Sequence, residues 1–330
     1  MSRRFALVAV LFSPLFLGGS APGIGTPFER AFELTYEVHL DSIPSSAKEL
    51  RIWIPLAASD DRQKISKRII NVPVPYRVTR EKENGNDVLY LDLRNPLPAS
   101  LDLAVEYEVD VRGQRVLLKA ARPGSLSMSR RMGFYLKPSR FMVIDDRIRS
   151  LARSVTDGAV TPAQKAERIY NYVIERMSYD KEIPGWGKGD TLRACEVGAG
   201  NCTDFHSLFI SLARASGIPA QFQIGLPLPD KQEGEIPGYH CWALFYLEGV
   251  GWVPVDASEA WKHREKTGYF FGTYDPNRLT VSTGRDIQLR PPPANGPLNI
   301  FFFPHVELDG KQVEKEKVKT KFTFKDIAKS

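Results

Sequence analysis

Apolar and polar residues alternate over most of the first third of the chain, between residues 28 and 118. The clearest runs are Phe32 to Leu40, Leu50 to Ile54 and Leu101 to Val111. A spacing of two places the apolar side chains on one face of an extended backbone, so each run predicts a β-strand. Turn signals such as Asn84-Gly85 separate the runs, and no helical periodicity interrupts them. The pattern predicts a small all-β, sandwich-like N-terminal domain over residues 28–118.

The periodicity changes after a basic, irregular stretch that we assign as a linker, residues 119–146. Thr161 is suited to an N-cap, Pro162 to the first turn, and Gln164 to the third position of a capping box. Apolar residues then recur at helical spacing as far as Met177. We therefore expect an amphipathic helix to open the second domain.

The second domain is expected to span residues 147–290. Another helix should begin at Asn201 and stop at Gly217-Ile218-Pro219, since glycine followed by proline ends helices. Strand-like runs follow at Ala220 to Leu226, Tyr239 to Leu247 and Trp252 to Asp256. Residues 291–330 are expected to form a C-terminal strand extension and a charged tail, in which lysines are mixed with acidic residues.

The first 21 residues have the three-part plan of a secretory signal peptide. Arg3 and Arg4 precede an apolar run from Phe5 to Leu17, and small residues follow it. The run is shorter than the roughly 20 residues that cross a bilayer. We expect the signal to be cleaved and the protein to be periplasmic or extracellular, with no membrane span left. The net charge of +6 is not gathered into a basic stripe with aromatic residues, so we expect no nucleic-acid partner.

Cys202 lies at the start of the second predicted helix, directly after a turn that contains Gly198 and Gly200. Free backbone N–H groups and the helix dipole favour a thiolate there and offer a donor to an oxyanion. Asp204, in the same turn, opposes the thiolate. Because most cysteines are simply buried core residues, a catalytic role also needs a base and a group that orients the base.

Two predicted strands supply those groups. His240 is the second residue of one predicted strand and Asp256 ends the next, so a hairpin brings them together. A turn centred on Glu248 would place His240 opposite Asp256, whereas a centre at Gly249-Val250 shifts the pairing by three residues. The sequence leaves both registers open. Cys202, His240 and Asp256 are the candidate catalytic triad.

Residues 197–256 resemble the core of the transglutaminase-like superfamily of cysteine enzymes. The resemblance rests on the cysteine helix with its Gly-Ile-Pro exit, on His240-Cys241-Trp242, and on the stretch from Gly251 to Asp256. It implies a papain-like α+β fold, with Cys202 as nucleophile, His240 as base and then acid, and Asp256 orienting the imidazole.

The implied reaction is acyl transfer through a thioester. The acyl donor would be a protein or peptide amide, either a glutamine carboxamide or a peptide bond, and the acceptor an amine or water. A peptidoglycan stem peptide is one candidate substrate. Some relatives lack the triad, so the alternative is a non-catalytic binding or scaffolding protein of the cell envelope. Neither a cofactor nor a metal ion is predicted.

Several residues near the triad leave alternatives open. His206 follows Cys202 by one helical turn, and we favour a buried, hydrogen-bonded histidine over a second base. Trp186 and Tyr179 are both candidates for the second oxyanion donor. Zinc is disfavoured, because the cysteines and histidines lack the spacing of zinc sites. A disulfide from Cys195 to Cys241 would leave Cys202 free, whereas one from Cys195 to Cys202 would block it.

Overall fold

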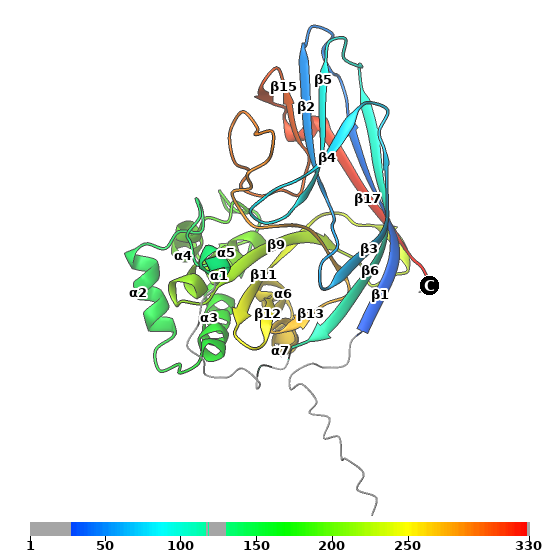
Figure 1. The fold of residues 1–330 in the computed structure, drawn as a ribbon. Helices are drawn as coiled ribbons and strands as arrows, with labels where there is room; N and C mark the ends of the chain where they lie inside the picture. Colours follow the sequence, from blue (N-terminus) through cyan, green and yellow to red (C-terminus); the bar gives the residue numbers. More distant parts are fainter. Residues whose placement is uncertain (1–27, 117, 119–129, 329–330) are drawn as a thin grey trace, which may run out of the picture.

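The computed structural model describes residues 28–116, 118 and 130–328. The predicted signal peptide, residues 1–21, and residues 119–129 of the predicted linker lie outside this range. Long strands make up the upper right of the molecule in Figure 1, and the helices gather at the lower left. Among the described residues, no helix is long and apolar enough to span a membrane.

Two antiparallel sheets form the N-terminal region, which is all β as predicted. The first has the order β10-β17-β1-β6-β13, with β3 also paired to β6, and the second has the order β16-β15-β2-β5-β4. Alternate residues of β1, such as Phe32 and Leu34, are buried, because they face the side chains of the other sheet. The strands of both sheets are β1 (Phe28–Leu40), β2 (Glu49–Leu56), β3 (Gln63–Asn71), β4 (Tyr76–Arg80), β5 (Asp87–Arg94), β6 (Leu101–Arg115), β10 (Glu233–Glu235), β13 (Thr273–Tyr274), β15 (His305–Leu308), β16 (Lys311–Gln312) and β17 (Val318–Asp326).

The C-terminal lysine-rich segment is a strand of the first sheet. β17 pairs with β1 along its whole length, from Val318 opposite Leu40 to Asp326 opposite Phe32. Phe322 and Phe324 are buried, while the lysines on either side of this pair, Lys319, Lys321 and Lys325, are exposed. The alternation of apolar and basic residues thus lets a segment near the end of the sequence form a strand of the N-terminal region, with its apolar side chains in the core.

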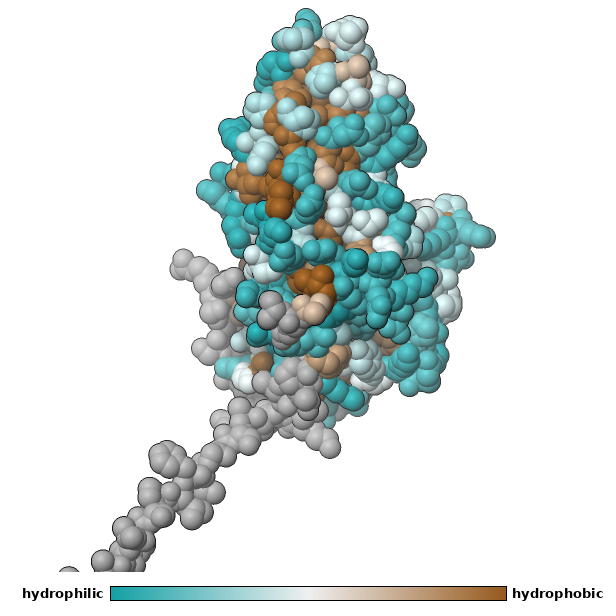
Figure 2. Space-filling model, turned by 90° about the vertical axis from the view of Figure 1, so that its right-hand side faces the viewer, coloured by the Kyte–Doolittle hydropathy of each residue, from teal (hydrophilic) through white to brown (hydrophobic). Residues whose placement is uncertain are grey.

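The outward face of the N-terminal strands is mixed in character. Figure 2 shows apolar side chains gathered in its upper half within a hydrophilic surround. β3 and β4 carry three of the exposed large apolar residues, namely Ile69, Tyr76 and Val78.

The second region packs helices against one face of a four-stranded antiparallel sheet with the order β12-β11-β9-β14. Its strands are β9 (Ala220–Pro227), β11 (His240–Leu247), β12 (Gly251–Val255) and β14 (Arg278–Thr283), and β7 (Ser178–Tyr179) and β8 (Ala199–Gly200) form a short parallel pair. Its helices are α1 (Arg130–Phe134), α2 (Asp146–Val155), α3 (Pro162–Arg176), α4 (Thr191–Val197), α5 (Cys202–Ala215), α6 (Ala257–Lys262) and α7 (Thr267–Phe270), with one short 3-10 helix, η2 (Arg264–Lys266). A second 3-10 helix, η3 (Lys315–Lys317), directly precedes β17 of the first sheet.

Both predicted helices begin where their capping residues place them. Thr161 caps α3, and the reciprocal hydrogen bonds of a capping box join it to Gln164. Asn201 caps α5, and Gly217 follows the end of this helix in the left-handed conformation with φ of 80°. Every residue of α5 from Cys202 to Ala213 is buried, so α5 is the central helix of the second region.

The register of the β11–β12 hairpin lies between the two that the sequence left open. Leu247 pairs with Gly251 and Ala243 with Val255, which centres the turn on Gly249. Gly249 has a φ of 77°, a left-handed conformation that glycine adopts without strain. The ladder brings Asp256 level with Trp242, so Asp256 reaches His240 diagonally across the hairpin.

Candidate active site

Cys202 is the first residue of α5 and is only 2% exposed. The Asn201 side chain accepts a hydrogen bond from the Thr203 N–H at 2.9 Å, and this bond fixes the first turn of the helix. The Cys202 side chain therefore stands at the positive end of the helix dipole, as the sequence predicted.

Asp204 holds the segment before α4 against the start of α5. Its carboxylate accepts hydrogen bonds from the N–H groups of Gly187 at 2.7 Å, Gly189 at 3.0 Å and Asn201 at 3.0 Å. At Gly189, where φ is 65°, a Cβ atom would collide with Ser207 and Arg285. Asp204 is thus a structural hydrogen-bond acceptor, a role beyond the charge opposing the thiolate that we inferred from the sequence.

His240 and Asp256 are in direct contact. The His240 Nε2 atom lies 2.6 Å from Asp256 Oδ2, and both side chains are buried. The other carboxylate oxygen, Oδ1, accepts hydrogen bonds from Ser258 Oγ at 3.0 Å and from the Glu259 N–H at 2.9 Å. Asp256 is also the N-cap of α6, so the start of this helix holds the carboxylate in place.

The charges of this site stabilise one another. Burial lowers the pKa of His240, but the charge of Asp256 and hydrogen bonds to Asp256 and Cys202 outweigh it and raise the pKa to about 9. Burial raises the pKa of Asp256, but the positive charges of His240 and Arg278 hold it well below its usual range. Asp256 is therefore ionised and His240 is an imidazolium at neutral pH.

The pKa of Cys202 lies well below the usual range for a thiol. A hydrogen bond from Cys241 contributes most, burial opposes it, and the hydrogen bond and charge of His240 add to the lowering. An S–H group is a weak donor whereas the imidazolium carries a full charge, so we regard His240 as the more important partner. The directions of these pKa shifts favour a thiolate–imidazolium pair between Cys202 and His240, which is the form that a cysteine nucleophile needs.

Cys241 lies beside Cys202, on the side of β11 that faces α5. Its sulfur is 3.6 Å from Thr203 Oγ1 and 4.0 Å from His206 Nδ1, and burial raises the pKa of its thiol. All three cysteines are free, and Cys195 is half-buried on α4. The cysteine that meets the nucleophile is Cys241, although both disulfides considered from the sequence involved Cys195.

His206 has two hydrogen-bond partners inside the core. Its Nδ1 atom donates to the Cys202 carbonyl at 2.7 Å, and its Nε2 atom accepts from the Ala257 N–H at 3.1 Å. Burial lowers its pKa, in keeping with a neutral ring. The interpretation of His206 as a buried, hydrogen-bonded histidine fits this geometry, because neither ring nitrogen is free to act as a base.

Arg278 was not predicted from the sequence. It begins β14, and its Nη2 atom lies 2.5 Å from Asp256 Oδ2. The guanidinium packs against the rings of Trp242 and Phe270, with its central carbon 5.4 Å and 6.0 Å from the ring centres. The sequence could not predict this contact, because Asp256 lies 22 positions earlier in the chain and the pairing of the strands between them has no local signal.

Two aromatic residues flank the nucleophile. The Tyr179 ring packs near Phe205 and Trp261, and burial followed by the charges of Cys202 and Cys241 raises its pKa. The Tyr239 hydroxyl accepts a hydrogen bond from Asn201 Nδ2 at 3.1 Å. Trp186 is 40% exposed. The Tyr179 hydroxyl, one of the two groups considered for the oxyanion, is within electrostatic reach of Cys202.

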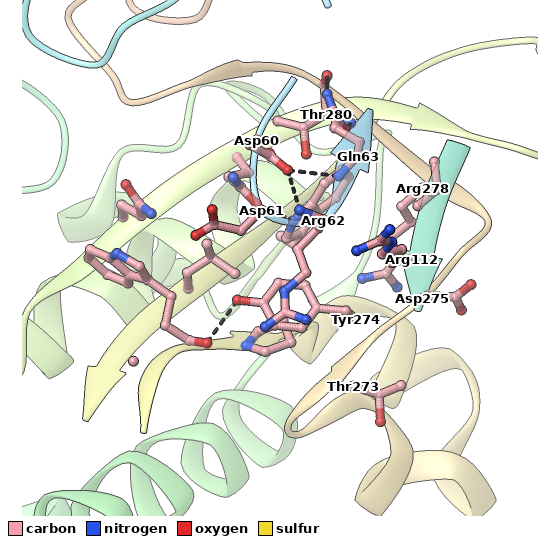
Figure 3. A pocket seen from close by; sticks show the side chains of 18 of the residues that line it. Asp60, Asp61, Arg62, Gln63, Arg112, Thr273, Tyr274, Asp275, Arg278 and Thr280 are labelled. Atoms are coloured by element: carbon pink, nitrogen blue, oxygen red, sulfur yellow. Dashed lines mark hydrogen bonds between the residues drawn. The ribbon is translucent and has the colours of Figure 1, made fainter. Parts of the chain in front are cut away.

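A pocket of about 320 Å³ lies against the opposite face of the sheet from α5. Figure 3 shows its walls: the segment Asp60–Gln63 comes from the N-terminal region, and Arg112 and Arg278 are both among the lining residues. Arg62 stacks on Tyr274 with its guanidinium carbon 4.3 Å from the ring centre. Arg278 connects this pocket with Asp256, because its side chain lines the pocket and its guanidinium contacts the Asp256 carboxylate.

Side-chain amides from the N-terminal region hold the free edge of β14. The Gln63 amide bonds both the carbonyl and the N–H of Thr280, at 2.9 Å and 2.8 Å. The Asn86 amide bonds the carbonyl and N–H of Thr283 in the same way, at 2.9 Å and 2.8 Å. These amides occupy the places that another strand would take, so the N-terminal region helps to set the position of Arg278.

No group of three or more histidine, cysteine or acidic side chains is arranged to hold a metal ion in the described part of the chain.

Comparison with known proteins identifies the core. Residues 149–257 match the model of the transglutaminase-like superfamily. This segment is a transglutaminase-like core. The match covers α3, the cysteine helix, both strands of the hairpin and Asp256. All of these except α3 are the elements on which the resemblance rested. The chain thus has a transglutaminase-like core, and an all-β region precedes the core.

Two individual proteins resemble the chain over most of its length. An uncharacterized protein from Haemophilus influenzae is 28% identical over 320 residues, covering 84% of this chain and 86% of the relative. The crystal structure of a proposed cysteine protease from Cytophaga hutchinsonii superposes with a TM-score of 0.64 and 15% identity, covering 92% of this chain and 94% of that one. The second likeness concerns the fold alone, and it includes the N-terminal sheets as well as the core.

Proposed function

We propose that the protein is an exported cysteine enzyme that transfers acyl groups through a thioester on Cys202. The observation that carries the proposal is the buried contact of His240 with Asp256 at 2.6 Å beside a cysteine at a helix N-terminus. This arrangement supplies a nucleophile, a base and an orienting carboxylate in one place.

The first half of the reaction forms the thioester. The Cys202 thiolate attacks the carbonyl carbon of a peptide amide, and the oxyanion that results accepts hydrogen bonds from donors at the start of α5. His240 then donates its proton to the leaving nitrogen, which departs as ammonia or an amine. In the second half, the neutral His240 accepts a proton from an amine or water as this acceptor attacks the thioester.

Tyr179 is the residue we favour as the second oxyanion donor. Its hydroxyl makes no hydrogen bond with another described residue, and it lies close enough to Cys202 to be affected by the thiolate charge. The Tyr239 hydroxyl accepts a hydrogen bond from Asn201 Nδ2, which leaves its own proton available, so Tyr239 is a second candidate for this role.

Export is supported by Arg3, Arg4 and the apolar run that follows them. The substrate would then be a protein or peptide outside the cytoplasm, either a glutamine carboxamide donor or a peptide bond such as that of a peptidoglycan stem peptide.

The test uses the mature protein, its Cys202→Ala variant and a Cys195→Ala control, which removes a thiol outside the site. Each is incubated with a glutamine peptide, or with a stem peptide, in the presence and absence of a primary amine. We expect ammonia release or peptide cleavage with the parent and the control alone, and amine incorporation identifies an amine acceptor. Equal yields from the parent and Cys202→Ala would disprove the proposal, and an unreactive Cys202 in the parent would favour a scaffolding protein.

A further inference from the structure

Asp256 divides its two oxygen atoms between different partners. Oδ1 is held by Ser258 and the Glu259 N–H, whereas Oδ2 meets His240 Nε2 at 2.6 Å and Arg278 Nη2 at 2.5 Å. Each oxygen atom of the orienting carboxylate therefore has its own polar partners that hold it in place. The Arg278 guanidinium and the His240 imidazole thus contact the same oxygen atom, Oδ2.

The Arg278 side chain is itself fixed. It is 11% exposed, its guanidinium packs against Trp242 and Phe270, and β14 is tied to the N-terminal region at Thr280. No further hydrogen bond joins the guanidinium to a described residue, so its remaining N–H groups line the pocket of Figure 3. A salt bridge with a carboxylate 1% exposed has a strong effect on that carboxylate, because water screens it little.

We propose that Arg278 is a positioning residue, which holds Asp256 ionised and turned toward His240 and thereby maintains the thiolate–imidazolium pair. This inference rests on the proposed role of Cys202 as the nucleophile. Arg278 does not contact the reacting atoms and acts through Asp256 alone.

Loss of the guanidinium has a defined consequence for the pH dependence of Cys202. The charged and titratable side chains that face Asp256 are His240 on β11, His206 on α5 and Arg278 on β14. At longer range, Tyr170 on α3 and Cys241 on β11 also interact with its charge. Without Arg278, Asp256 takes up a proton at a higher pH. A neutral Asp256 no longer supports the imidazolium, and Cys202 becomes a thiol.

The experiment measures the rate of Cys202 alkylation by iodoacetamide between pH 4 and 9, with the modified residue identified by mass spectrometry. An opposite charge at close range lowers the pKa of a carboxyl group by about 1 to 3 units, so we expect the acid limb to move to higher pH by at least about one unit in Arg278→Gln. At a pH below both limbs, the variant should then be alkylated roughly tenfold more slowly than the parent.

Arg51→Gln is a matched control. Arg51 lies 2.5 Å from the buried carboxylate of Glu307 and packs against Trp53, but it belongs to β2 in the N-terminal region. The Arg51→Gln substitution removes a comparable buried salt bridge in the N-terminal region, outside the candidate site. It should lower the melting temperature without moving the acid limb of the alkylation profile. A shift shared by both variants, or absent from a folded Arg278→Gln protein, would overturn the inference.

Arg278→Lys keeps the test decisive if Arg278→Gln does not fold. Lysine retains the charge, so its acid limb should lie near that of the parent, while loss of the paired geometry slows turnover at neutral pH. A lysine variant with the parent's turnover and a shifted acid limb contradicts the proposal. Failure of the acyl-transfer assay alone, with the alkylation shift present, would reject the proposed substrates and leave the role of Arg278 intact.

Discussion

Replacing Asp204 with alanine should destabilise the protein markedly. The buried carboxylate is the acceptor for the N–H groups of Gly187, Gly189 and Asn201. A buried donor left without its partner costs about 1 to 3 kcal/mol, so the loss of all three partners corresponds to about 3 to 9 kcal/mol. Burial, however, raises the pKa of Asp204 and shows that the charged form is held at some expense. We therefore expect a loss near the lower limit, about 3 kcal/mol in the free energy of unfolding.

Thermal unfolding followed by circular dichroism measures this loss. A change of 1 kcal/mol moves the melting temperature of a large domain by about 2 °C, so Asp204→Ala should melt about 6 °C below the parent. Asp190→Ala is the matched control, because Asp190 caps α4 through two longer bonds to the N–H groups of Leu192 and Arg193, at 3.1 Å and 3.3 Å. Loss of a cap costs about 1 kcal/mol, which corresponds to about 2 °C. If Asp204→Ala melts no lower than the control, the proposed structural role of Asp204 is wrong.

Three further changes test other parts of the site. His240→Gln removes the imidazolium, so at pH 6 a Cys202 thiol with an ordinary pKa should be alkylated roughly 100-fold more slowly than in the parent; a rate close to that of the parent would rule out the ion pair. In the parent, the acyl-transfer rate should fall as the pH rises through about 9, where His240 loses the proton it donates to the leaving group. Tyr179→Phe should lower kcat about 100-fold and leave the alkylation rate unchanged, as loss of one oxyanion donor does elsewhere; an unchanged kcat excludes Tyr179 from that role. Gln63→Ala should cost about 2 kcal/mol in thermal unfolding, because both of its bonds to β14 are lost.

The parts of the fold that were predictable depend on local sequence. The capping box at Thr161 and the cap at Asn201 act within one helical turn, and the alternation in β1 reports burial directly. The transglutaminase-like core was recognised for a similar reason, since the cysteine helix and the Gly251–Asp256 strand are continuous segments. In each case the residues that determine the structure lie next to one another in the chain.

The parts that were missed depend on pairing between distant segments. The hairpin register was decided by a turn centred on Gly249, which no residue type imposed uniquely. β17 could not be assigned to β1, because strands separated by the rest of the chain have no local signal for their pairing. The role of Arg278 became visible only once the structure placed β14 beside Asp256. In the same way, the proximity of Cys241 to Cys202 depends on the position of β11 beside α5.

The N-terminal region helps to position the candidate site without supplying any of its three proposed catalytic side chains. β14 is an edge strand of the catalytic sheet, and an edge strand with unpaired backbone groups is free to shift. The Gln63 and Asn86 amides pair with that edge at Thr280 and Thr283, and both amides are buried. Arg278 precedes Thr280 by two residues, so a β14 fixed in this way carries a fixed guanidinium to Asp256. The orientation of Asp256 thus depends on two amides outside the matched core, and the core by itself should form the Cys202–His240 pair less well than the whole chain does.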